Sequence, residues 1–85
     1  MVLAEKVSKG SQAKRLLNDP LTQEFIQRSK QQLIDRWEAT PSNAVDERET
    51  IHSQVSALKA LVDWLTQLSR AGDMAQAEIN KLHQA

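Results

Sequence analysis

The segment LIDRWEATPSNAVDERETIHSQV, residues 33–55, separates two stretches that favour helix and therefore decides how the chain folds. Pro41 disfavours helical geometry at Thr40, so we predict that the first of these helices ends at the Thr-Pro pair. Residues suited to capping a helix N-terminus follow directly: Ser42, Asn43 and Asp46. The segment thus predicts a corner between two helices.

Acidic residues begin the second helix. Asp46 and Glu49 have the spacing of a capping box, with Asp in place of the usual Ser or Thr. We expect Asp46, Glu47 and Glu49 to lie in the first turn, where the helix dipole favours negative charge. Capping and solubility therefore explain this acidic cluster without a metal ion or an acid–base reaction.

The second helix carries the clearest apolar pattern in the sequence. Its apolar residues alternate spacings of four and three, which is typical of a coiled-coil face: Ile51, Val55, Leu58, Val62 and Leu65, widened by Leu61 and Leu68. We predict that this face packs against the preceding helix and that Gly72 caps its C-terminus. Asp73 and Gln76 then have the spacing that starts a short final helix.

The first long helix begins at the sequence NDP, residues 18–20. Asp19 can accept a hydrogen bond from a free backbone N–H group, and Pro20 suits the first helical position. An apolar stripe follows at helical spacings: Leu21, Phe25, Ile26, Leu33, Ile34 and Trp37. Further upstream a glycine disfavours a continuous helix, so we predict a flexible tail over residues 1–10 and a single helical domain over residues 11–85.

Composition agrees with an all-helical chain. The 85 residues include two glycines, two prolines and no tyrosine, and aromatic residues make up 4%, so turn and strand formers are scarce. The predicted fold class is all-α: an antiparallel helical hairpin of two long helices with short flanking N- and C-terminal helices. Whether the hairpin closes on itself or exchanges helices with a second chain stays open at this point.

Charge and cysteine content exclude several classes of protein. Lys plus Arg and Asp plus Glu both number 11, and a net charge of zero argues against general nucleic-acid binding. The absence of cysteine excludes disulfide scaffolds and cysteine-based zinc sites. No apolar run is long enough for a signal peptide or a membrane span, so we expect a soluble protein made in a cytoplasm.

No residue pattern indicates catalysis, a cofactor or a metal ion. The two histidines, His52 and His83, belong to different predicted helices and show no His-Glu-x-x-His motif. The carboxylates near the corner are expected on a solvent-facing bend, whereas a metal site needs carboxylates that converge on one point. We therefore expect no catalytic, cofactor-binding or metal-ligating residue, and a protein that is not an enzyme.

Two tryptophans provide candidate binding residues. Trp37 precedes the corner, and Trp64 lies beside the apolar face of the second helix, where either a core position or partial exposure is compatible with the pattern. An exposed tryptophan on a small helical protein favours a role as an interface anchor. The candidate interface residues are Trp37, Leu61, Trp64 and Leu68.

Five short patterns lie within residues 10–79: Ala13 followed by Leu16-Leu17, the helix from Leu21 through Phe25, Trp37 followed by Thr40-Pro41, the pair Arg48-Glu49, and Gly72-Asp73. Together they resemble a group of small proteins encoded by tailed bacteriophages, typically among head-morphogenesis and virion genes. The resemblance implies a phage-encoded helical hairpin that serves as a virion or assembly component. It implies no catalytic residues.

The expected function is that of a phage structural or assembly protein that binds other proteins. A small chain with a modest core gains stability from association, so we expect a homo-oligomer or a complex with a head, portal or scaffold protein. Its expected location is the virion or the host cytoplasm. Two alternatives are a small phage inhibitor or modulator of a host protein and a DNA-binding packaging or regulatory factor. The acidic corner disfavours DNA binding because it would repel phosphate.

Overall fold

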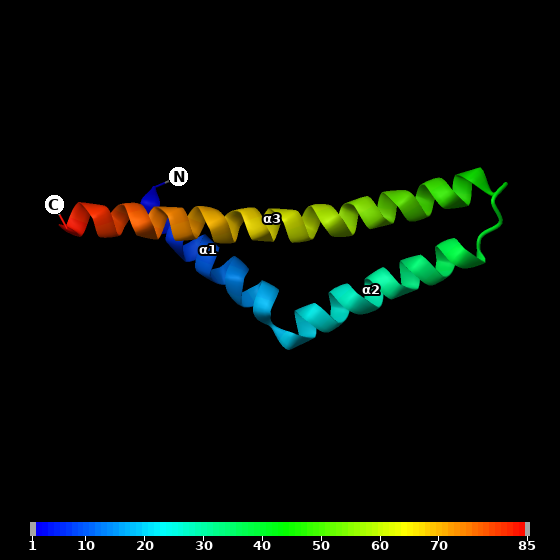
Figure 1. Ribbon diagram of the computed structural model, residues 1–85, viewed down its shortest axis with the longest axis horizontal. Coiled ribbons are helices and arrows are strands. Elements are labelled where there is room, and N and C mark those ends of the chain that lie inside the picture. The colour runs from blue at the N-terminus through cyan, green and yellow to red at the C-terminus, as the bar shows by residue number, and fades with distance from the viewer. Residues whose placement is uncertain (1, 85) are drawn as a thin grey trace.

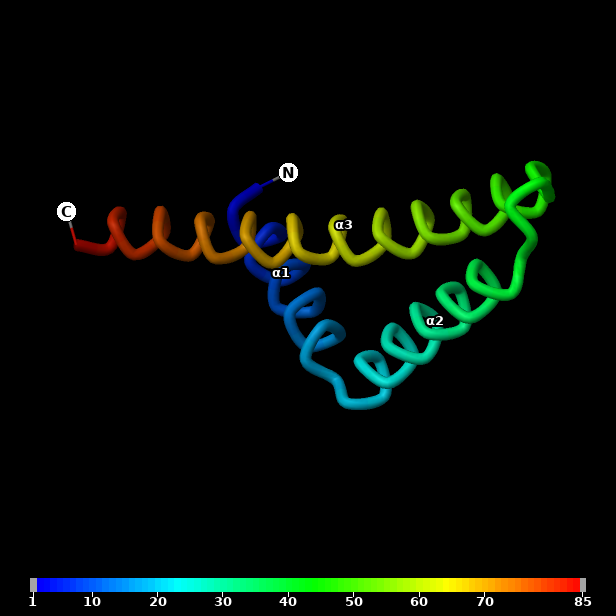
Figure 2. Tube along the Cα trace, turned by 45° about the vertical axis from the view of Figure 1, so that its right-hand side comes forward, coloured from blue at the N-terminus to red at the C-terminus, as the bar shows by residue number. Residues whose placement is uncertain are grey.

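Three α-helices form an elongated, open triangle in the computed structural model, which describes residues 2–84 (Figure 1). They are α1 (Leu3–Asn18), α2 (Pro20–Ala39) and α3 (Val45–Gln84). With 40 residues, α3 accounts for most of the 63 Å length of the molecule. α1 and α2 form the two shorter sides, which meet away from α3 (Figure 2). The all-α prediction is confirmed, since residues 2–84 contain no strand.

α1 and α3 cross in direct backbone contact at two glycines. Gly10 and Gly72 are both buried, and a Cβ atom at position 10 would lie only 2.6 Å from the Cα atom of Gly72. Ala13 of α1 and Ala75 of α3 are also buried. α1 packs on α3 far more extensively than α2 does. The two glycines therefore serve to let two helix backbones approach closely.

Both glycines lie inside helices rather than at helix ends. Residues 3–10, which were predicted to belong to a flexible tail, are helical, and the last of them is the packed Gly10. Position 1 of that tail and position 85 of the predicted domain lie outside the described residues. Gly72 ends no helix, because α3 continues to Gln84 and no described glycine has a positive φ angle. The predicted cap at Gly72 is wrong. The close crossing offsets the cost of about 1 kcal/mol that each glycine brings to a helix interior.

Asp73, one residue further along α3, does not start a final helix as predicted. It lies inside α3, and its Oδ1 atom is 2.8 Å from the Lys14 Nζ atom of α1. The ion pair joins the same two helices as the glycine crossing. Since both side chains are more than half exposed, it adds at most about 1 kcal/mol to the contact.

The joint between α1 and α2 is a capped helix start, as the sequence predicted. The Asp19 Oδ1 atom accepts hydrogen bonds from the backbone N–H groups of Leu21 (2.8 Å) and Thr22 (3.2 Å). Pro20 takes the first helical position, where its missing N–H group leaves no helical bond unmade. This cap fixes where α1 stops and α2 begins.

Arg48 holds the corner between α2 and α3. α2 ends before Thr40 and Pro41, as predicted, and the buried Thr40 hydroxyl donates to the Arg36 carbonyl at 2.5 Å. The Arg48 guanidinium donates to the carbonyl oxygens of Thr40 (3.1 Å) and Pro41 (3.2 Å). It also lies 4.3 Å from the centre of the Trp37 ring. One side chain thus connects the end of α2, the turn and the start of α3.

The capping box predicted for Asp46 and Glu49 is wrong. α3 begins at Val45, one residue before Asp46, so Asp46 is already inside the helix and cannot be its N-cap. The Ala44 N–H group bonds to the Pro41 carbonyl at 3.0 Å and closes a turn ahead of the helix. The placement of acidic residues in the first turn is confirmed for Asp46 and its neighbour at position 47, but it is wrong for Glu49, which is the fifth residue of α3.

α2 and α3 diverge from the corner instead of packing along their whole length (Figures 1 and 2). The reason lies in α1, which crosses α3 at an angle and carries the start of α2 away from it. The observed arrangement therefore differs from a hairpin of two long helices with short flanks. The N-terminal helix is the closest partner of α3, and the predicted C-terminal flank is part of α3 itself.

Candidate functional site

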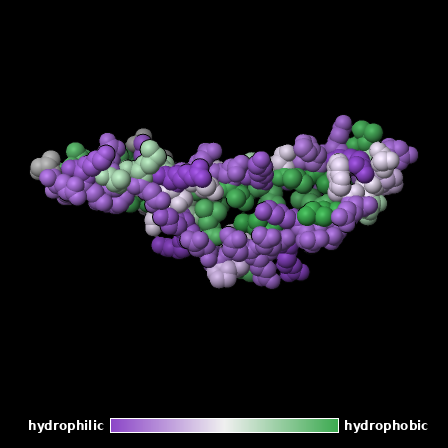
Figure 3. Space-filling model, in the orientation of Figure 1, coloured by the Kyte–Doolittle hydropathy of each residue, from purple (hydrophilic) through white to green (hydrophobic). Residues whose placement is uncertain are grey.

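An open groove of about 710 Å³ separates α2 from α3. Its apolar lining comes from both helices: Leu33, Ile34, Trp37, Ile51, Val55, Leu58 and Val62. Its remaining lining is charged or polar: Lys30, Glu38, His52, Lys59 and Asp63. Figure 3 shows apolar side chains, in green, gathered around the hollow between the two helices. We call this feature the α2–α3 groove.

The apolar stripe of α3 that was predicted to pack on α2 is only partly covered. Ile51, near the corner, is 1% exposed, whereas Val55, about one turn further on, is 44% exposed. Leu65, at the far end of the stripe, is buried again, and Leu58 and Val62 are half-buried. Because the two helices diverge between these ends, the middle of the stripe lines an open groove. Contiguous apolar surface of this kind marks sites where proteins bind partners.

Trp37 lies at the corner end of the groove and is 41% exposed. Arg48 stacks on its ring in cation–π geometry, while the same guanidinium binds two carbonyl groups of the turn. The ring is thereby held in one orientation relative to the corner. A held, partly exposed tryptophan loses little conformational entropy on binding, which suits an interface anchor.

A second apolar surface lies on another side of α3. Leu61 is exposed, Trp64 is 57% exposed, and the half-buried Leu68 lies beside α1. Residues two apart on a helix are separated by about 200°, so Trp64 faces away from Val62 and hence from the groove. We call Leu61, Trp64 and Leu68 the Trp64 face.

The four predicted interface residues therefore belong to two surfaces. The three residues of the Trp64 face follow one another at spacings of three and four on one helix, whereas Trp37 belongs to the α2–α3 groove. Sequence reasoning missed that Val55 is exposed and that the half-buried Leu58 lines an open groove. No local signal identifies them, because a stripe that packs on a neighbour and a stripe that lines an open groove have the same spacing.

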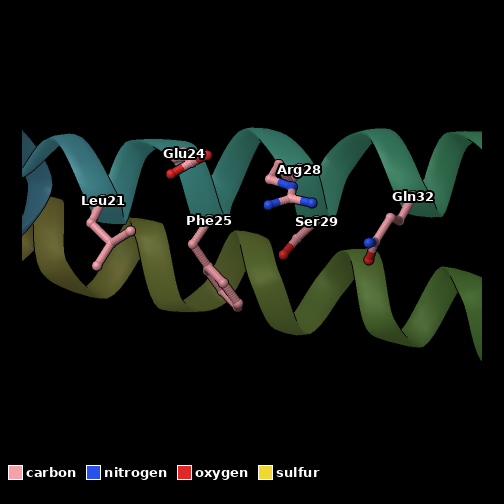
Figure 4. A pocket seen from close by; sticks show the side chains of 6 residues that line it. All are labelled: Leu21, Glu24, Phe25, Arg28, Ser29 and Gln32. Carbon is pink, nitrogen blue, oxygen red and sulfur yellow. The ribbon is translucent and has the colours of Figure 1, made fainter.

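α2 carries further exposed apolar residues beside a shallow pocket of about 420 Å³. Figure 4 shows Leu21 and Phe25 extending from the same side of this helix, and both are exposed. Ile26 is buried although it adjoins Phe25, because consecutive helical residues point about 100° apart. The predicted apolar stripe of α2 is thus split between an inner and an outer side.

Polar groups are distributed over the surface and do not converge. His52 lines the groove, His83 lies near the end of α3, and both are exposed. Four carboxylates near the corner are likewise exposed: Glu38, Asp46, Glu47 and Glu49. Within residues 2–84 no group of three or more histidine or carboxylate side chains is placed to hold a metal ion. None of the helices in this part of the chain combines the length and apolarity needed to cross a membrane.

The chain exposes more surface than a compact protein of its size. Its accessible surface is 6563 Å², whereas a compact monomer of 9.6 kDa exposes about 5,100 Å². Its Cα radius of gyration is 18.2 Å, against about 12 Å for a compact domain of 85 residues. About 1,500 Å² of surface beyond the compact expectation is therefore accessible to a partner.

The chain matches no protein-family model, no curated protein sequence and no solved structure. The resemblance to small phage-encoded proteins consequently stays a hypothesis. The α2–α3 groove and the Trp64 face are its candidate binding surfaces.

Proposed function

We propose that this chain is a non-enzymatic protein that works by binding other protein surfaces through its exposed apolar side chains. The observation that carries the proposal is the large apolar surface left open by the three-helix triangle, with a tryptophan on each of two sides. Tryptophan is enriched among the residues that dominate protein–protein binding energy.

The amount of surface supports a stable rather than a transient contact. A standard interface buries about 800 Å² from each partner, and the chain exposes about 1,500 Å² more than a compact monomer. Complete burial of that excess would resemble the interface of an obligate complex. The Trp64 face and the α2–α3 groove are the two surfaces available for it.

The proposed setting is a structural or assembly role in a tailed bacteriophage, in the virion or the host cytoplasm. Its support is the sequence resemblance described above. A head, portal or scaffold protein would then be the partner, alongside further copies of the chain.

Site-specific photo-crosslinking in cells that naturally produce the protein tests the binding role. The photoreactive residue p-benzoylphenylalanine replaces Trp64 in the full chain, and a matched variant carries it at the exposed, polar position Ser56 of the same helix. The expected result is a discrete crosslinked protein band from position 64 that is absent from position 56. Equal, diffuse labelling from both positions would contradict a binding role for the Trp64 face.

A further inference from the structure

We infer that the α2–α3 groove is closed by the same groove of a second copy, related by a two-fold axis so that the two grooves run antiparallel. This inference rests on the proposed binding role and names the partner of one of its two surfaces. Three properties of the groove carry it. The groove cannot close on itself, its charges attract those of a second groove that runs in the opposite direction, and its lining is apolar, as homodimer interfaces are.

The groove is held open at both ends by contacts within the chain. At one end, Arg48 binds the carbonyl groups of Thr40 and Pro41 and fixes the corner. At the other end, the crossing of Gly10 on Gly72 sets the course of α1, and the capped joint that follows places the start of α2. α2 therefore cannot swing onto α3 without breaking one of these contacts. Covering the apolar lining requires another molecule.

The charged residues of the groove differ in sign between its two ends. Glu38 lies at the corner end beside Trp37, whereas Lys30 lies two turns back along α2 and Lys59 lies two turns beyond the groove residue His52 on α3. Asp63 adjoins Lys59, and the end away from the corner stays net positive with it included. Across residues 2–84 none of these charged side chains forms an ion pair.

Reversing the direction of a second groove pairs these charges favourably. In an antiparallel arrangement Glu38 of each copy faces the end that carries Lys30 and Lys59 in the other copy. A parallel arrangement would place lysine against lysine and glutamate against glutamate, which is repulsive. The apolar residues between the two ends, Val55 and Leu58 among them, would then meet their own counterparts near the two-fold axis, as an isologous interface requires.

The apolar lining of the groove agrees with a homodimer. The excess of about 1,500 Å² belongs to the whole elongated chain, and the groove supplies a part of it to an interface of the kind that obligate homodimers form. Such interfaces are more apolar than transient ones, as this groove lining is.

Sedimentation equilibrium of the full chain, from low micromolar to submillimolar concentration, tests the pairing. The expected mass for the unmodified chain is twice 9.6 kDa. Val55→Glu places a charge in the middle of the apolar lining and is expected to weaken the dimer at least about a hundredfold. Ser53→Glu, two positions earlier and about 200° around the helix from Val55, is the matched control and is expected to leave the mass unchanged. Val55 is already 44% exposed, so circular dichroism should show the same helix content for both variants.

A charge exchange separates the antiparallel pairing from any other apolar contact. Glu38→Lys is expected to weaken the dimer about tenfold, and the double variant Lys30→Glu, Lys59→Glu by a similar factor. Combining all three substitutions reverses both ends together and is expected to restore the affinity to within about threefold of the unmodified chain.

Three results would overturn the inference, and they are distinguishable from failure of the proposed function. A chain of 9.6 kDa at every concentration would exclude the second copy, although a crosslinked partner from Trp64 would keep the binding role. A dimer that survives Val55→Glu but is lost in Trp64→Ala would place the second copy on the Trp64 face. Failure of the triple variant to recover affinity would exclude the antiparallel charge pairing.

Discussion

Replacing Gly10 by alanine should destabilise the protein, although the same change in an exposed helix would stabilise it. An added Cβ atom at this position would lie 2.6 Å from the Gly72 Cα atom and 2.8 Å from the Leu68 carbonyl oxygen. Both are backbone atoms, so no side-chain rotation relieves the clash. The crossing of α1 and α3 must widen, and the contacts of the buried Ala13 and Ala75 loosen with it.

The expected magnitude comes from two opposing effects. Alanine in place of glycine within a helix is worth about 1 kcal/mol of stability through backbone entropy. Overpacking of a tight contact typically costs about 1–3 kcal/mol, and separating the helices exposes apolar surface in addition. We expect Gly10→Ala to lower the free energy of unfolding by about 1–2 kcal/mol net. Gly72→Ala should cost somewhat less, because its nearest contact would be 2.8 Å, to the Gly10 Cα atom.

The two substitutions should not be additive. Once either Cβ atom has pushed the helices apart, the second one fits into the space created, so the double variant should lose less than the sum of the single losses. Urea denaturation followed by far-ultraviolet circular dichroism, at one fixed protein concentration, measures all three variants. Ser11→Ala, at the exposed neighbour of Gly10, is the matched control and should change stability by no more than about 0.5 kcal/mol. Stabilisation by Gly10→Ala, as at an exposed site, would refute the close crossing.

Other changes test the two joints and the ion pair by the same denaturation assay. Arg48→Lys should lower the free energy of unfolding by about 1–2 kcal/mol, because lysine cannot bond two carbonyls in a planar fork while stacking on an aromatic ring. The control Arg70→Lys, on an exposed part of α3, should lower it by less than about 0.5 kcal/mol. Equal losses from the two variants would contradict the role assigned to Arg48. Asp19→Ala should lower the free energy of unfolding by about 1 kcal/mol because it removes a helix cap, and Asp46→Ala should lower it clearly less because Asp46 is not a cap. A larger loss from Asp46→Ala than from Asp19→Ala would mean that Asp46 caps α3 after all. Lys14→Ala should lower the free energy of unfolding by less than about 1 kcal/mol, because the Lys14–Asp73 ion pair that it breaks is largely exposed. A higher salt concentration should reduce this effect further. A larger loss would mean that the ion pair, rather than the glycine crossing, joins α1 and α3.

Sequence reasoning predicted the features that depend on neighbouring residues. The cap at Asp19, the proline that follows it and the stop before Pro41 are local effects of side-chain hydrogen bonding and ring geometry, and each lies where it was predicted. The all-α class also follows from a local pattern, the spacing of apolar residues by three and four positions along each helix.

The features that sequence reasoning missed depend on residues far apart in the chain. Gly10 and Gly72 each look like a helix breaker or a cap when considered alone, and only their contact across 62 positions shows why a helix tolerates both. The direction of α2 follows from that crossing, so the divergence of α2 from α3 could not be predicted from the sequence either. Periodicity placed Trp64 on a different side of α3 from Val62, but it could not show that α1 and α2 leave this side uncovered.

Oxidative footprinting of the two tryptophans tests most directly whether the exposed apolar surfaces are binding surfaces. Brief hydroxyl-radical exposure, followed by mass spectrometry, compares Trp37 and Trp64 in the producing cells with the same residues in dilute purified protein. Met74, which is 74% exposed on α3, serves as the internal reference. If partners cover these surfaces, oxidation of both tryptophans relative to Met74 should fall severalfold in the cell. Identical ratios in the two samples would mean that the surfaces stay open to water and would contradict a function in protein binding.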